Sequence, residues 1–369
     1  MTSHRVSLLL ENRALVLPPR RQDTAPSSPV SDSARFEPSW WLPGPHAQTL
    51  WGSLTRGRRL VAFRREVLET PDGDDLVLDH LDGPEGSPRV ILLHGLEGSS
   101  HSVYVQGLLQ EIALRGWRAT AMNFRSCARD PDRLRRMLPN RRPRLYHSGE
   151  TEDLDLLVRT LSAREPRDIR LAIGSSLGGN VLLKWLGEHP GQRDVAAAVA
   201  LSTPYDLAAS GLHLESMSGR LYVGHLLSTL RAKALDAARR FPEAAARIDV
   251  PRTIASRSFR EFDDAANAPL HGFAGADDYY SRASSISFLS SIATPTLCLS
   301  ASDDPFLPLE ALERAKALAS AAVEFWITPR GGHIGWVTGA RPWRPGYFAE
   351  GASLDWLVRR AGVADGVPR

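Results

Sequence analysis

A serine flanked by glycines at a fixed spacing is the first feature of the chain that could do chemistry. Ser176 lies in the segment GSSLG (residues 174–178), with a glycine two positions before it and two positions after it. A strand that turns sharply into a helix, and so exposes a serine nucleophile, leaves room only for small residues at these two positions. Ser175 would have Ile173 and Leu177 there, so the spacing favours Ser176. Because this short motif is common by chance, the prediction depends on partners elsewhere in the chain.

A serine hydroxyl is a weak nucleophile at neutral pH, so it needs a base to take its proton and an acid to orient that base. His333 lies in the glycine-rich segment PRGGHIGW, directly after the last apolar segment with the character of a strand. We predict that His333 is the base. Four other histidines lie in turns, in loops or at helix starts, without a setting typical of a base: His94, His101, His147 and His271. His94, in the turn after the first parallel strand, is expected to be structural.

The orienting acid is expected in the loop after the preceding strand, which gives the chain order serine, acid, histidine. The segment LSASDDPFLP supplies two adjacent carboxylates, Asp303 and Asp304, whose side chains diverge, so only one of them can face His333. In the D-x-x-x-P form of this loop the acid stands four residues before the proline. With Pro308 as that proline the acid is Asp304, and Asp303 remains the alternative.

A tetrahedral oxyanion would need two backbone N–H donors, which usually supply the largest electrostatic contribution to such catalysis. The residue after the nucleophile, Leu177, is expected to supply one of them. The second is expected from the turn HGLEGSS (residues 94–100), where we favour Leu96. Gly95 and Gly98 in this turn let the backbone approach a ligand closely.

The elements that must position these residues can be recognised from the hydrophobic pattern. Two alternating apolar segments separated by Asp72-Gly73 predict a β-hairpin. From Pro88 onward, short and nearly continuous apolar strands alternate with helical segments, which predicts an α/β fold with a buried, mostly parallel sheet and helices on both faces. The predicted strands are RVILLHG, WRATAMNF, IRLAIGS, AAAVALSTP, TPTLCLSA and AVEFWITP.

The remaining segments predict one domain with two additions. Residues 1–35 mix Arg, Pro, Ser and Asp without hydrophobic period, so we expect a disordered tail followed by one domain over residues 36–369. Residues 36–54 are rich in Trp and Pro and predict an ordered arm packed on the domain surface. Residues 205–270 are rich in helix and poor in strand; an insertion there would lie above the carboxyl ends of the strands as a lid.

The composition excludes several classes of protein. Of the 369 residues 43% are apolar and 24% are charged, as in globular proteins, and the net charge of +3 does not by itself indicate nucleic-acid binding. The two cysteines, Cys127 and Cys298, have neither disulfide-framework nor metal-ligand spacing. No apolar stretch approaches the ~20 residues of a transmembrane helix. We expect a cytoplasmic protein without a transmembrane anchor, and we interpret the arginine-rich residues 131–144 as a solvated loop.

Several blocks of the sequence resemble the α/β-hydrolase superfamily and, within it, the YheT-type esterases of the AB hydrolase 4 family. The resemblance runs from about residue 36 to the end and rests on LPGPHAQTLWGSL, HGLEGSSHSVYVQGL, AMNFRSCA, LYHSGETEDL, IGSSLGGNVLLKWLGE, HGFAGADDYYSRAS, LSASDDPFLP and GGHIGW. It implies an eight-stranded, mostly parallel sheet with a lid, and ester or acylglycerol hydrolysis without a cofactor. The roles of the family's triad fall on Ser176, Asp304 and His333. The basic loop looks longer than the family's pattern, and the N-terminal tail is extra.

The sequence therefore predicts a serine esterase that cleaves short- or medium-chain esters or acylglycerols through an acyl-enzyme. Two other hypotheses remain: an acyltransferase that uses the same triad, and a catalytically idle binding protein whose basic loop holds an anionic partner. The expected partner is a small-molecule or lipid ester, no nucleic acid is expected, and peripheral contact with a membrane stays open. The oligomeric state is not predicted.

Overall fold

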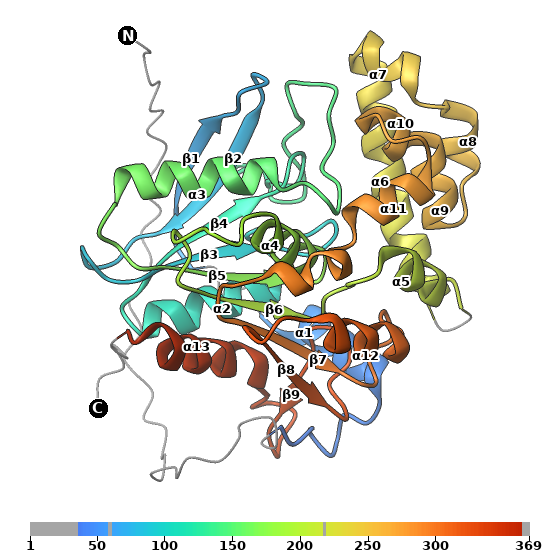
Figure 1. Ribbon diagram of the computed structural model, residues 1–369. Coiled ribbons are helices and arrows are strands. Elements are labelled where there is room, and N and C mark those ends of the chain that lie inside the picture. Colours follow the sequence, from blue (N-terminus) through green and yellow to red (C-terminus); the bar gives the residue numbers. More distant parts are fainter. Residues whose placement is uncertain (1–35, 58–60, 217–218, 364–369) are drawn as a thin grey trace.

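An eight-stranded sheet runs through the centre of the computed structural model, which describes residues 36–57, 61–216 and 219–363 (Figure 1). Its strands lie in the order β1-β2-β4-β3-β5-β6-β7-β8, and β2 runs opposite in direction to the other seven strands of this sheet. The predicted α/β fold with a mostly parallel sheet is confirmed. The predicted tail, residues 1–35, lies outside the described residues. The strands are β1 Arg64–Glu69, β2 Asp75–Leu81, β3 Arg89–Leu93, β4 Arg118–Asn123, β5 Arg170–Ser175, β6 Ala197–Leu201, β7 Thr296–Ala301 and β8 Val323–Thr328.

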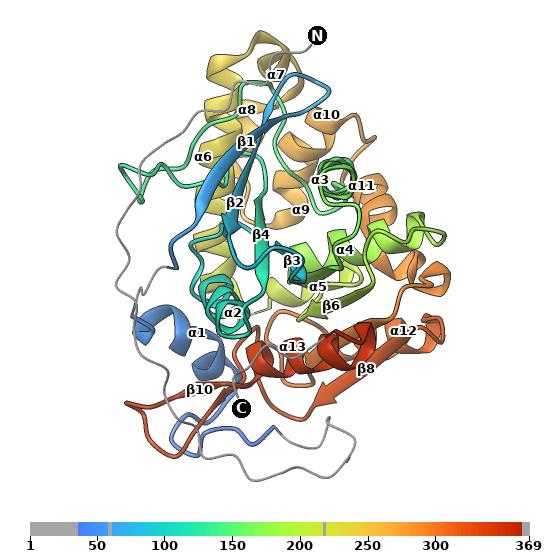
Figure 2. The same cartoon turned by 90° about the vertical axis from the view of Figure 1, so that its left-hand side faces the viewer.

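Helices cover both faces of the sheet, as the two views in Figures 1 and 2 show. On β3, Ile91 and Leu93 pack with α3 and α4, whereas Val90 and Leu92 pack with α2 and α13. Successive side chains of a strand point to opposite faces, so a strand buried on both faces has to be apolar throughout. The helices outside the segment between β6 and β7 are α1 Pro45–Thr55, α2 Val103–Leu114, α3 Glu152–Arg164, α4 Leu177–Glu188, α12 Leu309–Leu318 and α13 Phe348–Ala361.

A series of helices separates β6 from β7 and lies to one side of the sheet in Figure 1. This helical insertion, from α5 to α11, has an apolar core of its own that includes Leu227, Ala234 and Phe262. It continues to Ala283, beyond the residue 270 expected from the sequence. Its elements are α5 Leu207–Leu214, α6 Arg220–Arg240, α7 Pro242–Arg247, α8 Val250–Ala255, α9 Phe259–Phe262, a π-helical turn Asp263–Asn267, α10 Ala268–His271 and α11 Ala276–Ala283, and two 3₁₀ turns follow, Ser285–Ser287 and Leu289–Ser291.

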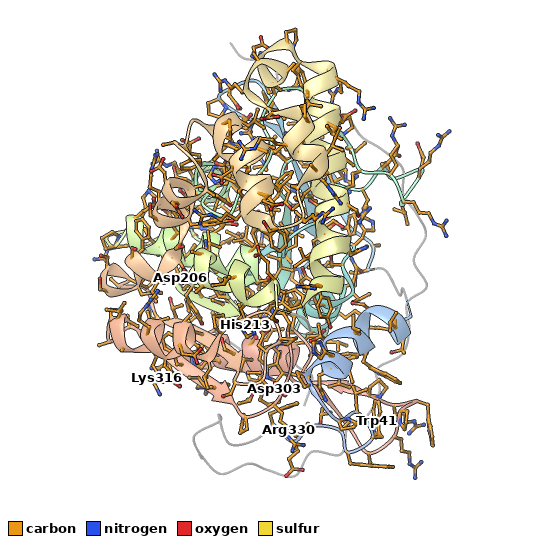
Figure 3. The ribbon with its side chains drawn as sticks, turned by 90° about the vertical axis from the view of Figure 1, so that its right-hand side faces the viewer. Trp41, Asp206, His213, Asp303, Lys316 and Arg330 are labelled. Atoms are coloured by element: carbon orange, nitrogen blue, oxygen red, sulfur yellow. The ribbon has the colours of Figure 1, made fainter. Side chains whose placement is uncertain are left out.

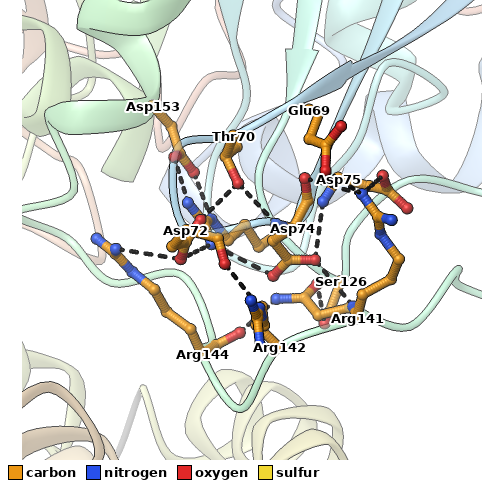
Figure 4. A network of polar contacts seen from close by, with 12 residues as sticks. Glu69, Thr70, Asp72, Asp74, Asp75, Ser126, Arg141, Arg142, Arg144 and Asp153 are labelled. Atoms are coloured by element: carbon orange, nitrogen blue, oxygen red, sulfur yellow. Dashed lines mark hydrogen bonds and ion pairs between the residues drawn. The ribbon is translucent and has the colours of Figure 1, made fainter. Parts of the chain in front are cut away.

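The predicted hairpin and the arginine-rich loop meet at one end of the sheet (Figure 4). The hairpin of β1 and β2 turns at Gly73, whose φ is +77°, a conformation that glycine adopts without strain. Arg141 pairs with Asp75 at 2.7 Å, and the Nε of Arg142 donates to the carbonyl oxygen of Asp72 at 2.6 Å. Part of the loop's positive charge is therefore paired within the protein rather than free for a ligand.

A buried arginine ties this hairpin turn to the helix α3. Arg125 contacts the Asp72 carboxylate at 2.7 Å and binds both oxygens of Asp153, at 2.7 and 2.8 Å. The sequence block NFR contains Arg125 and the block YHSGETEDL contains Asp153, so the two blocks are joined by a structural ion pair. Within the described part of the chain, no helix combines the length and the apolar character needed to cross a membrane.

Candidate active site

The nucleophile prediction falls on a strained turn between β5 and α4. Ser176 has φ +52° and ψ −121°, a backbone conformation that residues with a side chain rarely adopt. The neighbouring glycines are required by close approach of backbone. A Cβ on Gly174 would lie 2.4 Å from the carbonyl oxygen of Gly178, and a Cβ on Gly178 would lie 2.6 Å from the carbonyl oxygens of Leu93 and His94. The turn therefore permits only glycine at both positions.

Three predicted residues from three loops form one continuous hydrogen-bonded chain. The Oγ of Ser176 lies 3.0 Å from Nε2 of His333, and Nδ1 of His333 lies 2.9 and 3.1 Å from the two carboxylate oxygens of Asp304. Their side chains come together because the carboxyl ends of β5, β7 and β8 meet at one edge of the sheet. Asp304 is 3% exposed and His333 is 8% exposed, so the contact between these two side chains is shielded from water.

The two adjacent aspartates have different tasks. Asp304 faces the imidazole, whereas Asp303 turns away and accepts the backbone N–H of Gly332 at 2.9 Å. Figure 3 shows Asp303 near Arg330, on the loop that follows the neighbouring strand β8. Burial raises the pKa of Asp303 above its ordinary value, and the N–H of Gly332 opposes that shift. The geometry thus favours Asp304 as the partner of His333 and assigns Asp303 to the backbone beside it.

The imidazole of His333 is held from several sides. Its backbone N–H donates to Oγ1 of Thr49 at 2.9 Å, and the next N–H, of Ile334, donates to Oγ of Ser202 at 3.0 Å. The ring of Phe306 stacks on the imidazole with centroids 4.1 Å apart and planes 8° apart. The N–H of Phe306 also donates to Asp304 at 2.8 Å.

The N-terminal arm is a support of this site that was not predicted from the sequence. Gln48, on α1, is 1% exposed; its Oε1 accepts the N–H of Val337 at 2.6 Å and its Nε2 donates to the carbonyl oxygen of the same residue at 3.2 Å. Gln48 and Thr49 therefore hold the loop that carries His333 through hydrogen bonds to its backbone. The sequence signal that could have identified this support is the pair of polar residues Gln48 and Thr49, in the segment HAQTL of an arm rich in aromatic residues.

The two predicted oxyanion donors, Leu96 and Leu177, face the cavity that also contains Ser176. Leu177 is the first residue of α4, where a helix leaves its N–H groups without an internal partner. Among the residues that the structure describes, no protein atom accepts the N–H of either leucine. Neither N–H is therefore used in a hydrogen bond within the described part of the protein.

The cavity beside Ser176 and His333 is mostly apolar. Its lining residues come from the sheet edge and from the helical insertion, and the apolar ones include Leu96, Leu145, Leu207, Leu214, Leu226, Leu230, Phe259, Phe262, Phe306 and Leu307. The space open to the centres of water-sized molecules is about 130 Å³, roughly ten times what one water needs. The lining therefore offers mainly apolar contacts to a bound molecule.

One wall of the cavity carries a polar cluster from the helical insertion. Tyr280 donates to the carboxylate of Asp263 at 2.7 Å, and Asn267 donates to its other oxygen at 3.0 Å. Burial raises the pKa of Asp263 to about 7. The hydroxyl of Ser210, on the same cavity wall, has no hydrogen-bond partner among the described residues.

The histidines judged weaker from the sequence are engaged elsewhere. His94 contacts the carbonyl oxygen of Gly95 at 2.8 Å and accepts the N–H of Phe124 at 3.1 Å, and burial lowers its pKa to about 3. His147 and His271 pack ring against ring, with centroids 4.5 Å apart, and burial lowers the pKa of both. In the described ranges, no group of three or more His, Cys, Asp or Glu side chains is placed to hold a metal ion.

The family model of the alpha/beta hydrolase fold matches residues 88–340. The chain belongs to the α/β-hydrolase family. It is 35% identical over 338 residues to a protein of Escherichia coli strain K12 named "Putative esterase YheT", a match that covers 91% of this chain and 96% of the relative. The predicted resemblance to the YheT-type esterases is therefore confirmed.

Two more distant relatives carry names of lipid-cleaving enzymes. The chain is 30% identical over 321 residues to Phospholipase ABHD3 of Bos taurus, covering 85% of this chain and 76% of the relative. It is 29% identical over 283 residues to the Monoacylglycerol lipase of Saccharomyces cerevisiae, covering 74% of this chain and 59% of the relative. Together with the esterase name of the Escherichia coli relative, these names support a carboxylic ester hydrolase.

Proposed function

We propose that the protein cleaves short- or medium-chain carboxylic esters or acylglycerols through an acyl-enzyme on Ser176. The observation that carries this proposal is the continuous chain of hydrogen bonds from Ser176 through His333 to Asp304, which opens onto an apolar cavity. A binding protein would gain nothing from a strained serine and an oriented imidazole at hydrogen-bond distance. A serine hydrolase requires both.

In the proposed first step, Oγ of Ser176 attacks the ester carbonyl carbon while Nε2 of His333 takes its proton. The carboxylate of Asp304 holds the Nδ1–H tautomer and stabilises the imidazolium that forms. The carbonyl oxygen becomes an oxyanion, which the N–H groups of Leu96 and Leu177 would bind. The tetrahedral intermediate then collapses; the C–O bond to the alcohol breaks, and the imidazolium returns the proton to the departing oxygen.

In the proposed second step, water replaces the alcohol. His333 takes a proton from water, whose oxygen attacks the acyl carbon, and the same N–H groups receive the second oxyanion. On collapse the bond between the acyl carbon and Oγ of Ser176 breaks, the imidazolium of His333 returns its proton to Oγ, and the carboxylic acid leaves. No cofactor takes part in either step.

We further propose that the helical insertion acts as the lid over the site, with the predicted segment 205–270 as its main part. Residues of α5, α6 and α9 line the cavity together with Ser176, so the shape of this insertion would select the acyl chain. The apolar lining of the cavity would hold the acyl chain, and the extent of the cavity would limit the length of that chain.

The proposal is tested by turnover of a chain-length series of p-nitrophenyl esters and monoacylglycerols. Wild type should hydrolyse them with an optimum at short to medium length, and Ser176→Ala should lose at least about 10⁴-fold in kcat. Ser175→Ala is the matched control, because it removes the neighbouring hydroxyl and leaves the nucleophile. Turnover by Ser176→Ala at the wild-type rate would refute the proposal.

A further inference from the structure

The turn that carries Leu96 has a conformation that its own sequence does not favour. Glu97 has φ +57°, the left-handed region that residues with a side chain rarely occupy. One hydrogen bond closes the turn, from the N–H of Gly98 to the carbonyl oxygen of Gly95 at 3.0 Å. The direction of the Leu96 N–H depends on the peptide planes on either side of it, so contacts from outside have to hold this turn.

Two tyrosines, the partly buried Tyr104 and the buried Tyr146, hold the backbone on both sides of Leu96. The N–H of Gly95 donates to the hydroxyl of Tyr104 at 2.7 Å, and the N–H of Glu97 donates to the hydroxyl of Tyr146 at 2.8 Å. The N–H between them, of Leu96, has no acceptor in the described part of the protein. The turn therefore presents one free donor between two fixed ones.

A lysine from the helical insertion completes this arrangement. Nζ of Lys233, on α6, lies 2.7 Å from Oε1 of Glu97, the same oxygen to which the hydroxyl of Tyr146 donates at 2.8 Å. The side chains of Lys233 and Glu97 are 11% and 6% exposed, and Nζ also lies 3.2 Å from Sγ of Cys127. Lys233 lines the cavity, so the ion pair joins α6 to the turn directly beside the substrate space.

Buried charge pairs are costly to desolvate and are weak evidence for a role in stability alone. An apolar side chain at position 233 would pack α6 against the sheet without burying two charges. The ammonium group of Lys233 compensates the charge of the Glu97 carboxylate, which belongs to the residue directly after Leu96.

We propose that Lys233 is a positioning residue of the oxyanion hole, which holds Glu97 and thereby fixes the direction of the Leu96 N–H. This inference rests on the proposed function, because it assumes that Leu96 binds the oxyanion. If Lys233 has this role, the oxyanion hole is complete only when α6 contacts the turn that carries Leu96. The assembly of the hole is thus coupled to the position of the helical insertion.

The test compares Lys233→Met with Arg231→Met, a matched change on the same helix. Among the described residues, the guanidinium of Arg231 bonds only within the insertion, to the carbonyl oxygens of Leu227, Ile254 and Ser256 at 3.2, 3.2 and 3.0 Å. For each variant, kcat and KM are measured with p-nitrophenyl butyrate. The inhibition constant of an alkyl trifluoromethyl ketone is measured as well, because its adduct with Ser176 places an oxyanion in the hole.

Lys233→Met is expected to lose at least about ten-fold in kcat, less than the 10²–10³-fold that removal of a whole donor costs. KM should stay within about two-fold, ketone affinity should fall by the same factor as kcat, and Lys233→Arg should recover part of the loss. The double variant Lys233→Met/Glu97→Gln leaves no buried charge unpaired, so it keeps the test valid if Lys233→Met does not fold. It should show the same loss.

The inference is overturned if the folded lysine variants match Arg231→Met in kcat and in ketone affinity. It is also overturned if the loss lies in KM alone. Failure of the proposed function looks different: wild type itself would neither turn over the ester nor bind the ketone through Ser176.

Discussion

The contrast between Asp303 and Asp304 gives a sharp prediction, because two adjacent carboxylates should respond to the same substitution very differently. In Asp304→Asn an amide replaces the carboxylate that lies 2.9 Å from Nδ1 of His333. An amide group facing Nδ1 with its N–H₂ favours the imidazole tautomer with the proton on Nε2. That tautomer cannot take the proton of Ser176.

The expected loss follows from the chemistry of such triads. The aspartate-to-asparagine change in a Ser-His-Asp triad lowers kcat by about 10⁴, which corresponds to about 5 kcal/mol of transition-state stabilisation. In Asp303→Asn the side-chain oxygen can still accept the N–H of Gly332, now 2.9 Å from Oδ1. Only the charge of that acceptor is lost, so kcat should fall by less than about ten-fold, or about 1.4 kcal/mol.

The assay is steady-state hydrolysis of p-nitrophenyl butyrate by both variants at pH 8, with thermal unfolding to show that both are folded. The predicted ratio between the two kcat values is about 10³ or more. Equal losses in the two variants, or a greater loss in Asp303→Asn, would refute the assignment of Asp304 as the orienting acid.

Three further predictions concern the surroundings of the site. Thr49→Val removes the acceptor of the buried His333 N–H and should cost about 1–3 kcal/mol of stability and about ten-fold in kcat; urea unfolding and ester hydrolysis check this, and unchanged values in both would contradict it. The pKa of Asp263 is raised from 3.8 to about 7, so its contribution to the free energy of unfolding is full below pH 4 and is lost as the pH rises to 7. Asp263→Asn should therefore gain stability over wild type between pH 4.5 and pH 8, by up to about 4 kcal/mol, and a difference that does not change with pH would refute this. Gly211 lines the cavity and a Cβ there would meet nothing within 4 Å, so Gly211→Leu should shift the preferred ester to shorter chains. Gly224→Leu, at an exposed and equally open position of α6, should leave the chain-length profile unchanged.

The sheet could be predicted from the sequence because each of its central strands is buried on both faces. In the segment RVILL every residue after Arg89 is apolar, and the glycines at 174 and 178 mark a turn that requires them on both sides of a serine. The chain order of Ser176, Asp304 and His333 then followed from the order of the strands. Periodicity and strand order are local or linear properties, so a sequence carries them directly.

The supports of the site could not be predicted, because each depends on a contact between distant segments. Gln48 and Val337 are separated by 289 residues, and nothing local to either residue identifies the other. The helix α1 was missed because an arm rich in Trp and Pro has no helical periodicity. Glu97 resembles an ordinary turn residue until Lys233, 136 residues later, is seen beside it.

The choice between Asp303 and Asp304 shows where spacing stops being informative. The distance to Pro308 favoured Asp304, yet adjacent carboxylates differ only in the direction that the chain gives their side chains. Only the fold shows that one faces Nδ1 of His333 and the other faces the N–H of Gly332.

The central claim is that Ser176 is the nucleophile, and covalent trapping tests it most directly. Wild type, Ser176→Ala and Ser175→Ala are treated with a fluorophosphonate, and the modified peptide is identified by mass spectrometry. The account predicts one adduct, on Ser176, in wild type and in Ser175→Ala, and none in Ser176→Ala. Labelling of Ser176→Ala to the wild-type extent, or an adduct on another residue of wild type, would contradict it.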